Sequence, residues 1–252
     1  MESLLLPSKI RYAVGDRPNE GILTVEPCSP GYGTTVGNAI RRVLLSSLPG
    51  AAVTAVKIKG VDHEFSTMQH VKEDVVEIIL NLKGLRVKMH SEEPVKLFLK
   101  ADGEKAVTAA DIQANADVEL ANPDHQICTL TDKNASIEME LTIAQGRGYR
   151  STEDRAKEKL ELGNIAIDAL YSPVLNVSYK VQATRVGDKT DYDKLILRVE
   201  TDGTLDPKDA IRQSVQILID HFNLLADPEE GEVDTAEVEE APAEDGSEED
   251  TE

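Results

Sequence analysis

The segment TTVGNAIRRVLLSSLPG, residues 34–50, places the strongest constraint on how this chain can fold. Its apolar side chains recur at spacings of three and four residues, which is the period of one helix face. They are Val36, Ala39, Ile40, Val43 and Leu44. Arg41 and Arg42 lie between them, so at least one guanidinium must leave that face. We therefore predict a helix over Thr34–Leu48 that is apolar on one side and cationic on the other. Such a helix is typical of an assembly surface and not of a catalytic pocket.

A second apolar helix is predicted over Pro207–Leu225. Asp206 is its expected N-cap, and Pro207 suits the first helical position. Its main stripe comprises Ile211, Val215, Leu218, Phe222 and Leu225, widened by Ile217, Ile219 and Leu224. An apolar arc this wide needs two burial partners. One can be the chain's own sheet, and a second copy of the chain is the simplest other partner. Burial inside one large monomeric domain remains the alternative.

The segments between these helices favour strands. Apolar and polar residues alternate over 53–60, 95–100, 137–143, 177–184 and 194–199, as expected for half-buried strands. A further strand is predicted at Ile22–Val25, whereas residues 1–20 read as polar and poorly patterned. Helical spacing returns at Val71–Leu82, and Gly84 is expected to end that helix in a left-handed conformation. The pattern predicts an α+β fold.

The charge of the chain is concentrated at one end. The 252 residues carry a formal net charge of −20, with 47 acidic and 27 basic residues. Residues 227–252 hold 14 of the acidic residues and no Lys or Arg, which leaves 33 acidic and 27 basic residues elsewhere. This acidic segment is expected to be disordered, because it cannot bury enough apolar area to offset its ordering entropy. The remainder has no basic field that would attract a phosphate backbone directly.

Cysteine content and hydropathy indicate the cellular compartment in which the chain is expected. Cys28 and Cys128 are the only cysteines, and no signal peptide is evident before them. We expect two reduced thiols in a cytoplasmic protein. No stretch approaches the ~18 apolar residues of a membrane span, so no membrane association is expected.

Three segments resemble catalytic or binding motifs but have simpler explanations. Gly31–Gly37 has the spacing GxGxxxG and lacks the Lys-Ser/Thr pair of a P-loop, so a tight turn into the first helix is expected. The segment around His63 and His70 lacks the ligand spacing of a metal site, so a structural histidine is expected. GRGY at 146–149 occurs once and suits a turn after a strand. No catalytic or metal-ligating residue is predicted, and no cofactor is expected in this chain.

Several long blocks of the sequence resemble the alpha subunit of bacterial DNA-directed RNA polymerase. They occur in family order over roughly residues 15–225. The blocks are residues 31–67 (GYGTTVGNAIRRVLLSSLPGAAVTAVKIKGVDHEFST), 71–85 (VKEDVVEIILNLKGL), 127–139 (ICTLTDKNASIEM), 146–149 (GRGY), 168–174 (DALYSPV), 185–197 (RVGDKTDYDKLIL) and 200–218 (ETDGTLDPKDAIRQSVQIL).

The resemblance implies a two-subdomain scaffold. Residues 1–50 plus 174–226 would form an antiparallel sheet with two packed helices, through which two copies pair. Residues 51–173 would form an inserted, mostly β subdomain. The dimer would bind the beta and beta-prime subunits of an enzyme that makes RNA on a DNA template. The catalytic magnesium would lie in beta-prime, and DNA would be bound only through the assembled enzyme.

The resemblance also implies roles for individual residues. The second arginine of the family motif, Arg42 here, would contact beta together with Leu45 and the neighbouring Arg41. An arginine suits such a contact, because its planar fork pairs with carboxylates or carbonyls. The expected dimer interface comprises Val36, Ile40, Val43, Leu44, Ile211, Val215, Leu218 and Phe222.

The sequence departs from the family pattern at its end. Family members usually continue through a linker into a small helical domain that touches promoter DNA, whereas this chain continues into the acidic segment. We expect either a fragment or a lineage without that domain, so upstream-DNA recognition is not predicted. A regulatory homodimer outside the polymerase core and a stand-alone small-molecule enzyme remain as alternatives.

Overall fold

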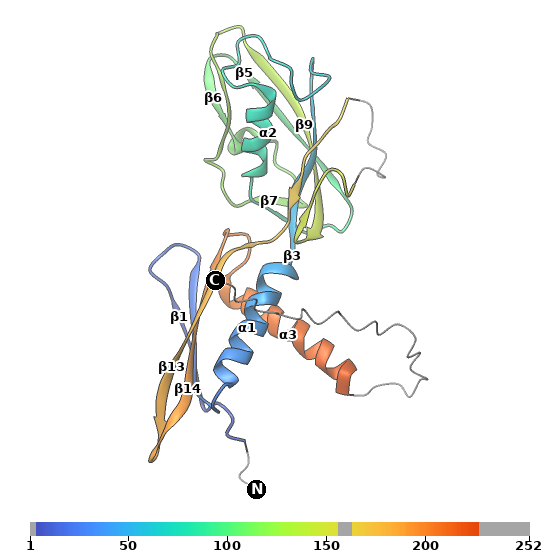
Figure 1. Cartoon of the computed structure of the whole chain (residues 1–252). Helices are drawn as coiled ribbons and strands as arrows, with labels where there is room; N and C mark the ends of the chain where they lie inside the picture. Colours follow the sequence, from blue (N-terminus) through green and yellow to red (C-terminus); the bar gives the residue numbers. More distant parts are fainter. Residues whose placement is uncertain (1–3, 156–162, 227–252) are drawn as a thin grey trace, which may run out of the picture.

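The structure, a computed structural model, describes residues 4–155 and 163–226. The chain forms two parts that meet at a narrow waist (Figure 1). We call residues 4–48 and 174–226 the terminal part and residues 49–173 the central part. The acidic segment 227–252 and residues 156–162 lie outside the described residues.

The terminal part is a four-stranded antiparallel sheet covered on one face by two helices. The strand order is β1-β2-β14-β13. The bounds are β1 Lys9–Val14, β2 Glu20–Cys28, β13 Val174–Val186, β14 Lys189–Thr201, α1 Tyr32–Ser46 and α3 Pro207–Ala226. Alternate residues of β14 bury against both helices, so Leu197 and Val199 share a core with Leu44 and Ile211. The period-two pattern of the sequence thus becomes one apolar sheet face.

The central part is mostly β and encloses one helix. Its main sheet has the order β5-β9-β3-β4-β7, with β11 paired to β3. Two further pairs are β6 with β8 and β10 with β12. The bounds are β3 Pro49–Ile58, α2 Val75–Lys83, β4 Val87–Met89, β5 Val95–Asp102, β6 Lys105–Thr108, η1 Ala109–Asp111, β7 Val118–Leu120, β8 Gln126–Leu130, β9 Ser136–Arg147, β10 Tyr149–Arg150, β11 Ile165–Ala166 and β12 Ala169–Leu170.

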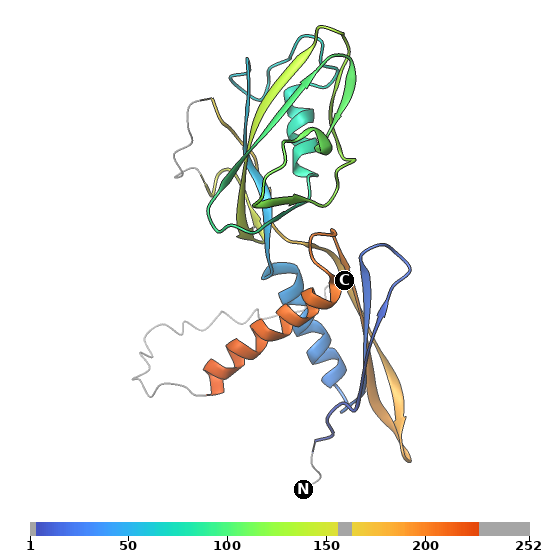
Figure 2. The same cartoon turned by 180° about the vertical axis from the view of Figure 1, so that it is seen from behind.

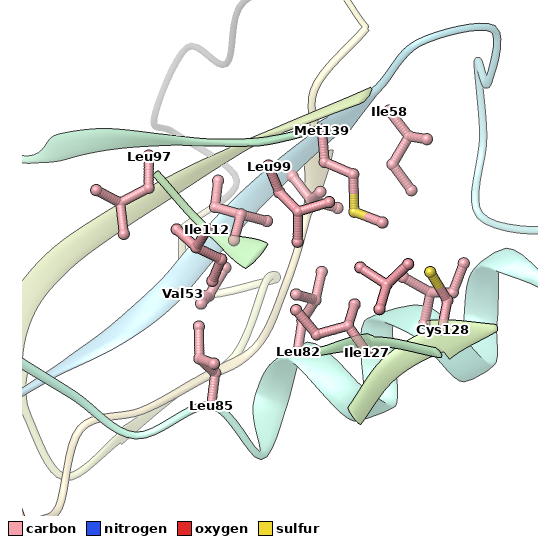
Figure 3. Packing of buried hydrophobic residues seen from close by; sticks show 14 of the residues in the cluster. Val53, Ile58, Leu82, Leu85, Leu97, Leu99, Ile112, Ile127, Cys128 and Met139 are labelled. Carbon is pink, nitrogen blue, oxygen red and sulfur yellow. The ribbon is translucent and has the colours of Figure 1, made fainter. Parts of the chain in front are cut away.

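The central part has its own hydrophobic core, separate from that of the terminal part. Figure 3 shows how side chains of the main sheet, such as Leu97, Leu99 and Met139, face Leu82 of α2 and Ile127 of β8. Each part therefore buries apolar surface independently of the other. The exact subdomain boundaries of 50/51 and 173/174 stay a prediction.

The α+β prediction is confirmed, and the first and last helices lie close to their expected positions, whereas the helix expected at Val71–Leu82 begins later, at Val75, where Asp74 is the N-cap. The helix expected at Thr34–Leu48 runs from Tyr32 to Ser46. The last helix begins at Pro207, where the Asp206 carboxylate accepts a hydrogen bond from the Lys208 amide at 2.8 Å.

Two local predictions are wrong. Residues 9–14 form the edge strand β1, although residues 1–20 were expected to be unpatterned. Gly84 has a φ of −79°, not a left-handed conformation. A side chain at Gly84 would lie 2.8 Å from the His125 ring, so close packing, not a positive φ, requires the glycine there.

The waist depends on close backbone contact. A Cβ at Gly50 would overlap the carbonyl oxygen of Tyr171, and one at Gly146 would lie 2.6 Å from the Tyr171 ring. Tyr171 also donates its amide to the Gly148 carbonyl at 2.8 Å. The outgoing and returning segments of the chain therefore run side by side between the two parts.

Candidate assembly surface

The start of α1 is fixed by a carboxylate from β14. Gly31 precedes the helix with a φ of 82°, a left-handed conformation that favours glycine. The Asp193 carboxylate accepts hydrogen bonds from the Gly31 and Gly33 amides at 2.9 and 3.1 Å. These amides have no partner within the helix, and a negative charge there suits the helix dipole. The motif expected to be a tight turn into a helix is therefore a helix start held by a distant side chain.

The buried face of α1 is made partly of glycines. A Cβ at Gly33 would lie 3.0 Å from Val181, and one at Gly37 would lie 2.8 Å from the Tyr179 ring. The helix can therefore approach β13 closely, and Ile40 and Leu44 continue the same buried face. The apolar stripe read from the sequence leaves these glycines out. For that reason it is rotated relative to the face that the chain buries.

The opposite side of α1 meets α3 at an open groove of about 570 Å³. Its lining is partly apolar and includes one arginine. The residues are Thr34, Thr35, Asn38, Ala39, Arg42, Val43 and Leu218. Val36 lies one turn before Ala39 and Ile40 and is 37% exposed. This groove joins two helices from opposite ends of the sequence into one surface.

The second half of α3 carries large apolar side chains into solvent. Phe222 is 59% exposed, Leu224 77% and Leu225 73%. Both views show this half of the helix extending past the sheet and the rest of the described chain (Figures 1 and 2). The first half is different, because Ala210, Ile211 and Ser214 are buried.

The two arginines of α1 have different surroundings. Arg41 donates from Nε to the Val177 carbonyl at 3.1 Å, which ties α1 to β13. Arg42 is exposed and lines the groove between the helices. Leu45, one turn further along, is also exposed, and its carbonyl accepts a hydrogen bond from Ser172 at 3.3 Å. Arg42 and Leu45 are thus both accessible to a partner, whereas Arg41 also has a structural role.

The predicted dimer residues divide by exposure. Ile40, Leu44 and Ile211 are buried within the single chain, so they belong to its core and lie beneath the exposed surface. The side chains with area left for a partner are Val36, Val43, Val215, Leu218 and Phe222. Sequence periodicity finds both sets, because it does not show which apolar residues the sheet already covers. The role of the second set in an interface stays a prediction.

The remaining candidate groups are the histidine segment and the two cysteines. The described residues contain no cluster of three or more His, Cys, Asp or Glu side chains that could hold a metal ion. His63 lies with Nδ1 3.1 Å from the Ser66 hydroxyl on an exposed loop. Cys28 and Cys128 are free and buried, and burial raises the pKa of Cys128 to about 12, with Glu73 and Asp111 adding to the shift. Such a thiol is a poor nucleophile at neutral pH.

Comparison with known proteins gives this surface a context. Residues 56–172 match the family model of the RNA polymerase Rpb3/RpoA insert domain. Over 205 residues the chain is 54% identical to the DNA-directed RNA polymerase subunit alpha of Alkaliphilus oremlandii, covering 81% of this chain and 64% of the relative. The chain belongs to the bacterial RNA polymerase alpha-subunit family.

Two further relatives support the same assignment. The alpha subunit of Roseiflexus sp. is 50% identical over 209 residues, covering 83% of this chain and 64% of that protein. The alpha subunit of Leifsonia xyli subsp. xyli is 53% identical over 200 residues, covering 79% of this chain and 60% of that protein. The chain thus spans less than two thirds of the length of these alpha subunits. Among the described residues, no helix is both long and apolar enough to cross a membrane.

Proposed function

We propose that this chain is a non-catalytic alpha subunit of DNA-directed RNA polymerase that acts as a scaffold. Two copies pair through α1 and α3, and the dimer gathers the beta and beta-prime subunits for RNA synthesis in transcription. The reacting groups and the magnesium ion belong to beta-prime. DNA reaches this chain only through the assembled enzyme, and the complex works in the cytoplasm.

The exposed apolar half of α3 carries this proposal. A single chain gains nothing from holding Phe222, Leu224 and Leu225 in water on a well-formed helix. Burial of each large apolar side chain contributes about 1.5–3 kcal/mol, which is available to offset the cost of association. A partner bound through polar contacts alone would not account for the exposure of these three apolar side chains.

A second copy is the partner that this geometry favours. The exposed half of α3 follows Leu218, which lines the groove formed with α1, and Ala39 and Val43 add apolar area to that groove. In a twofold dimer the same patch meets itself, so one apolar helix end can fill the groove of the other copy. Arg42 also lines this groove and is exposed in the single chain, and we infer that its guanidinium stays accessible for a beta contact.

Light scattering after size exclusion tests the pairing. We expect the native chain to elute as a dimer at micromolar concentration, and Phe222→Glu to shift it to monomer. Asn223→Glu is the matched control, because it adds the same charge about 100° around the helix and is expected to stay dimeric. A native chain that remains monomeric at high micromolar concentration would overturn the proposed pairing.

Co-purification with the large subunits tests the scaffold role separately. We expect tagged chain to retain beta and beta-prime from a reconstituted mixture. A stable dimer that ignores both would instead support a regulatory homodimer outside the polymerase core.

A further inference from the structure

The two parts of the chain are joined covalently at adjacent points. The chain leaves the terminal part at Pro49–Gly50 and returns at Tyr171–Val174. These crossings touch, because Gly50 leaves no room for a Cβ beside the Tyr171 carbonyl. Gly50 is also paired with Gly146 in the β3–β9 ladder. Two adjacent links can act as a hinge, and the hydrogen bonds beside them, from Ser172 to the Leu45 carbonyl at 3.3 Å and from the Asp202 amide to the Pro173 carbonyl at 3.0 Å, lie close to its axis.

A side-chain hydrogen bond joins the two parts in addition to these crossings. Arg86 follows α2 in the central part, and Asp202 follows β14 in the terminal part. Arg86 donates from Nη1 to the Asp202 backbone carbonyl at 3.1 Å. Both residues are half-buried, so water competes less strongly for this bond than at an open surface.

Arg86 is held firmly on its own side of the waist. Its amide donates to the Asn122 side-chain oxygen at 2.9 Å, and its carbonyl accepts from the Ala121 amide at 2.9 Å. Asn122 also donates to the Gly84 carbonyl at 2.9 Å. The guanidinium therefore extends from a fixed backbone.

Asp202 is equally well fixed. Its amide donates to the Pro173 carbonyl at 3.0 Å. Its carboxylate accepts from the Thr204 amide and hydroxyl at 2.9 and 2.6 Å. The Asp202 carbonyl is thus already oriented, and the bond with Arg86 joins two pre-formed sites.

The space between the parts does not lock their angle by packing. A crevice of about 230 Å³ lies at the waist, and both parts line it. Val87 and Lys88 face it from the central part, and Thr204, Leu205 and Gln213 from the terminal part. Because this crevice is open, the parts can move relative to each other without compressing a close-packed core.

We propose that the hydrogen bond from Arg86 to Asp202 fixes the angle between the two parts, which are otherwise joined by a hinge. We call Arg86 the latch of this hinge. With the Arg86–Asp202 bond made, the parts hold one angle; without it, they rotate about the crossings. If the chain is the scaffold proposed above, this latch sets where the central part stands relative to the dimer and its large-subunit partners. The latch itself does not depend on that function.

Electron spin resonance distance measurement tests the latch on the full chain. Nitroxide labels at Glu92→Cys and Lys180→Cys report the separation of the two parts, since both positions are exposed. The native thiols are buried and have raised pKa values, mainly through burial, so they react slowly. Dilution with unlabelled chain removes distances between copies.

We expect a narrow distance distribution for the doubly labelled parent and a broadened or two-peaked one for Arg86→Ala. Loss of a charged donor should raise the ratio of open to closed chains by about tenfold or more. Arg86→Met keeps the aliphatic stem and guards against a folding defect, so it should broaden the distribution equally. Lys88→Ala, on the same crevice, should leave it unchanged.

An unchanged distribution in both Arg86 variants would overturn the latch, as would equal broadening in Lys88→Ala. Light scattering of the same samples separates this result from the proposed pairing. The Arg86 variants are expected to remain dimeric, because the bond lies outside the α1–α3 surface.

Discussion

At the scale of single residues, Asp168 shows how one carboxylate can connect three segments of the central part. It accepts hydrogen bonds from Lys83 at the end of α2, at 2.9 Å, and from the Thr152 amide, also at 2.9 Å. It lies between β11 and β12. The Lys83 bond, followed by the Thr152 bond, lowers the pKa of Asp168 from 3.8 to about 2. The folded state therefore prefers the ionised carboxylate.

This preference predicts a pH-dependent contribution to stability. Because the folded pKa is lowered, the stabilisation is present above pH 3.8 and is lost as the pH falls through about 2. Asp168→Asn should cost about 1 kcal/mol at pH 7, since solvent screens a partly exposed pair. Urea unfolding of both proteins should show this difference at pH 7 and little difference near pH 2. A constant difference across that range would contradict the assignment.

Residue-scale features were only partly predictable from the sequence. The glycine motif at 31–37 is predicted to lead into a helix, and α1 begins there. That the histidine and glycine segments have no catalytic role stays a prediction. The sequence does not show why Gly84 is required, because His125, which packs against it, is 41 positions further along the chain. The Arg86–Asp202 bond spans 116 positions. No local pattern could have indicated either contact.

At the scale of elements, α1 depends on a partner that is distant in sequence. Asp193 of β14 supplies the acceptor for the first amides of the helix, a role that a residue at the helix start usually plays. The same strand packs Leu195 and Leu197 beneath the helices. The β13–β14 hairpin thus both supports α1 and fixes its beginning.

Removal of this acceptor should destabilise the terminal part. Asp193→Ala is expected to lower the free energy of unfolding by about 0.5–2 kcal/mol, as for loss of a helix cap. Asp193→Asn keeps an acceptor oxygen and should lose less. Urea titration followed by circular dichroism measures both.

Asp191→Ala is the matched control for this prediction, because Asp191 is an exposed carboxylate on the same strand. Equal destabilisation by Asp191→Ala and Asp193→Ala would show that the loss of stability comes from removing a negative charge from β14, and not from losing the cap of α1.

Elements were predictable where their periodicity is long and missed where it is short. The helices over 34–48 and 207–225 each span several turns of apolar repeat, and both were found within two residues of their positions. In β1, Ile10, Tyr12 and Val14 do alternate with polar or small residues. That signal is weak, because the strand is an exposed edge and polar residues dominate the segment around it.

At the scale of the whole molecule, two separate cores and a narrow waist produce a chain with distinct surfaces. The terminal part presents the α1–α3 patch, and the central part extends away from it (Figure 2). The sequence predicts that α3 has an apolar arc too wide for one partner. Only the fold shows that the chain leaves the second half of this helix uncovered, because burial of the helix depends on where β2 and β14 lie.

The separation of surfaces leads to a prediction about Arg42. Arg42 is exposed and lines the groove, while Phe222, Leu224 and Leu225, the most exposed apolar side chains of α3, lie beyond Leu218 along that helix. Arg42→Ala should therefore weaken capture of the beta subunit by about tenfold, the typical effect of removing an interface arginine, and leave the homodimer intact. Titration of beta onto immobilised chain, with light scattering of the same variant, measures both quantities. Arg185→Ala removes an exposed arginine from the far hairpin and should change neither. Parallel loss of pairing and beta binding in Arg42→Ala would instead place Arg42 inside the dimer contact.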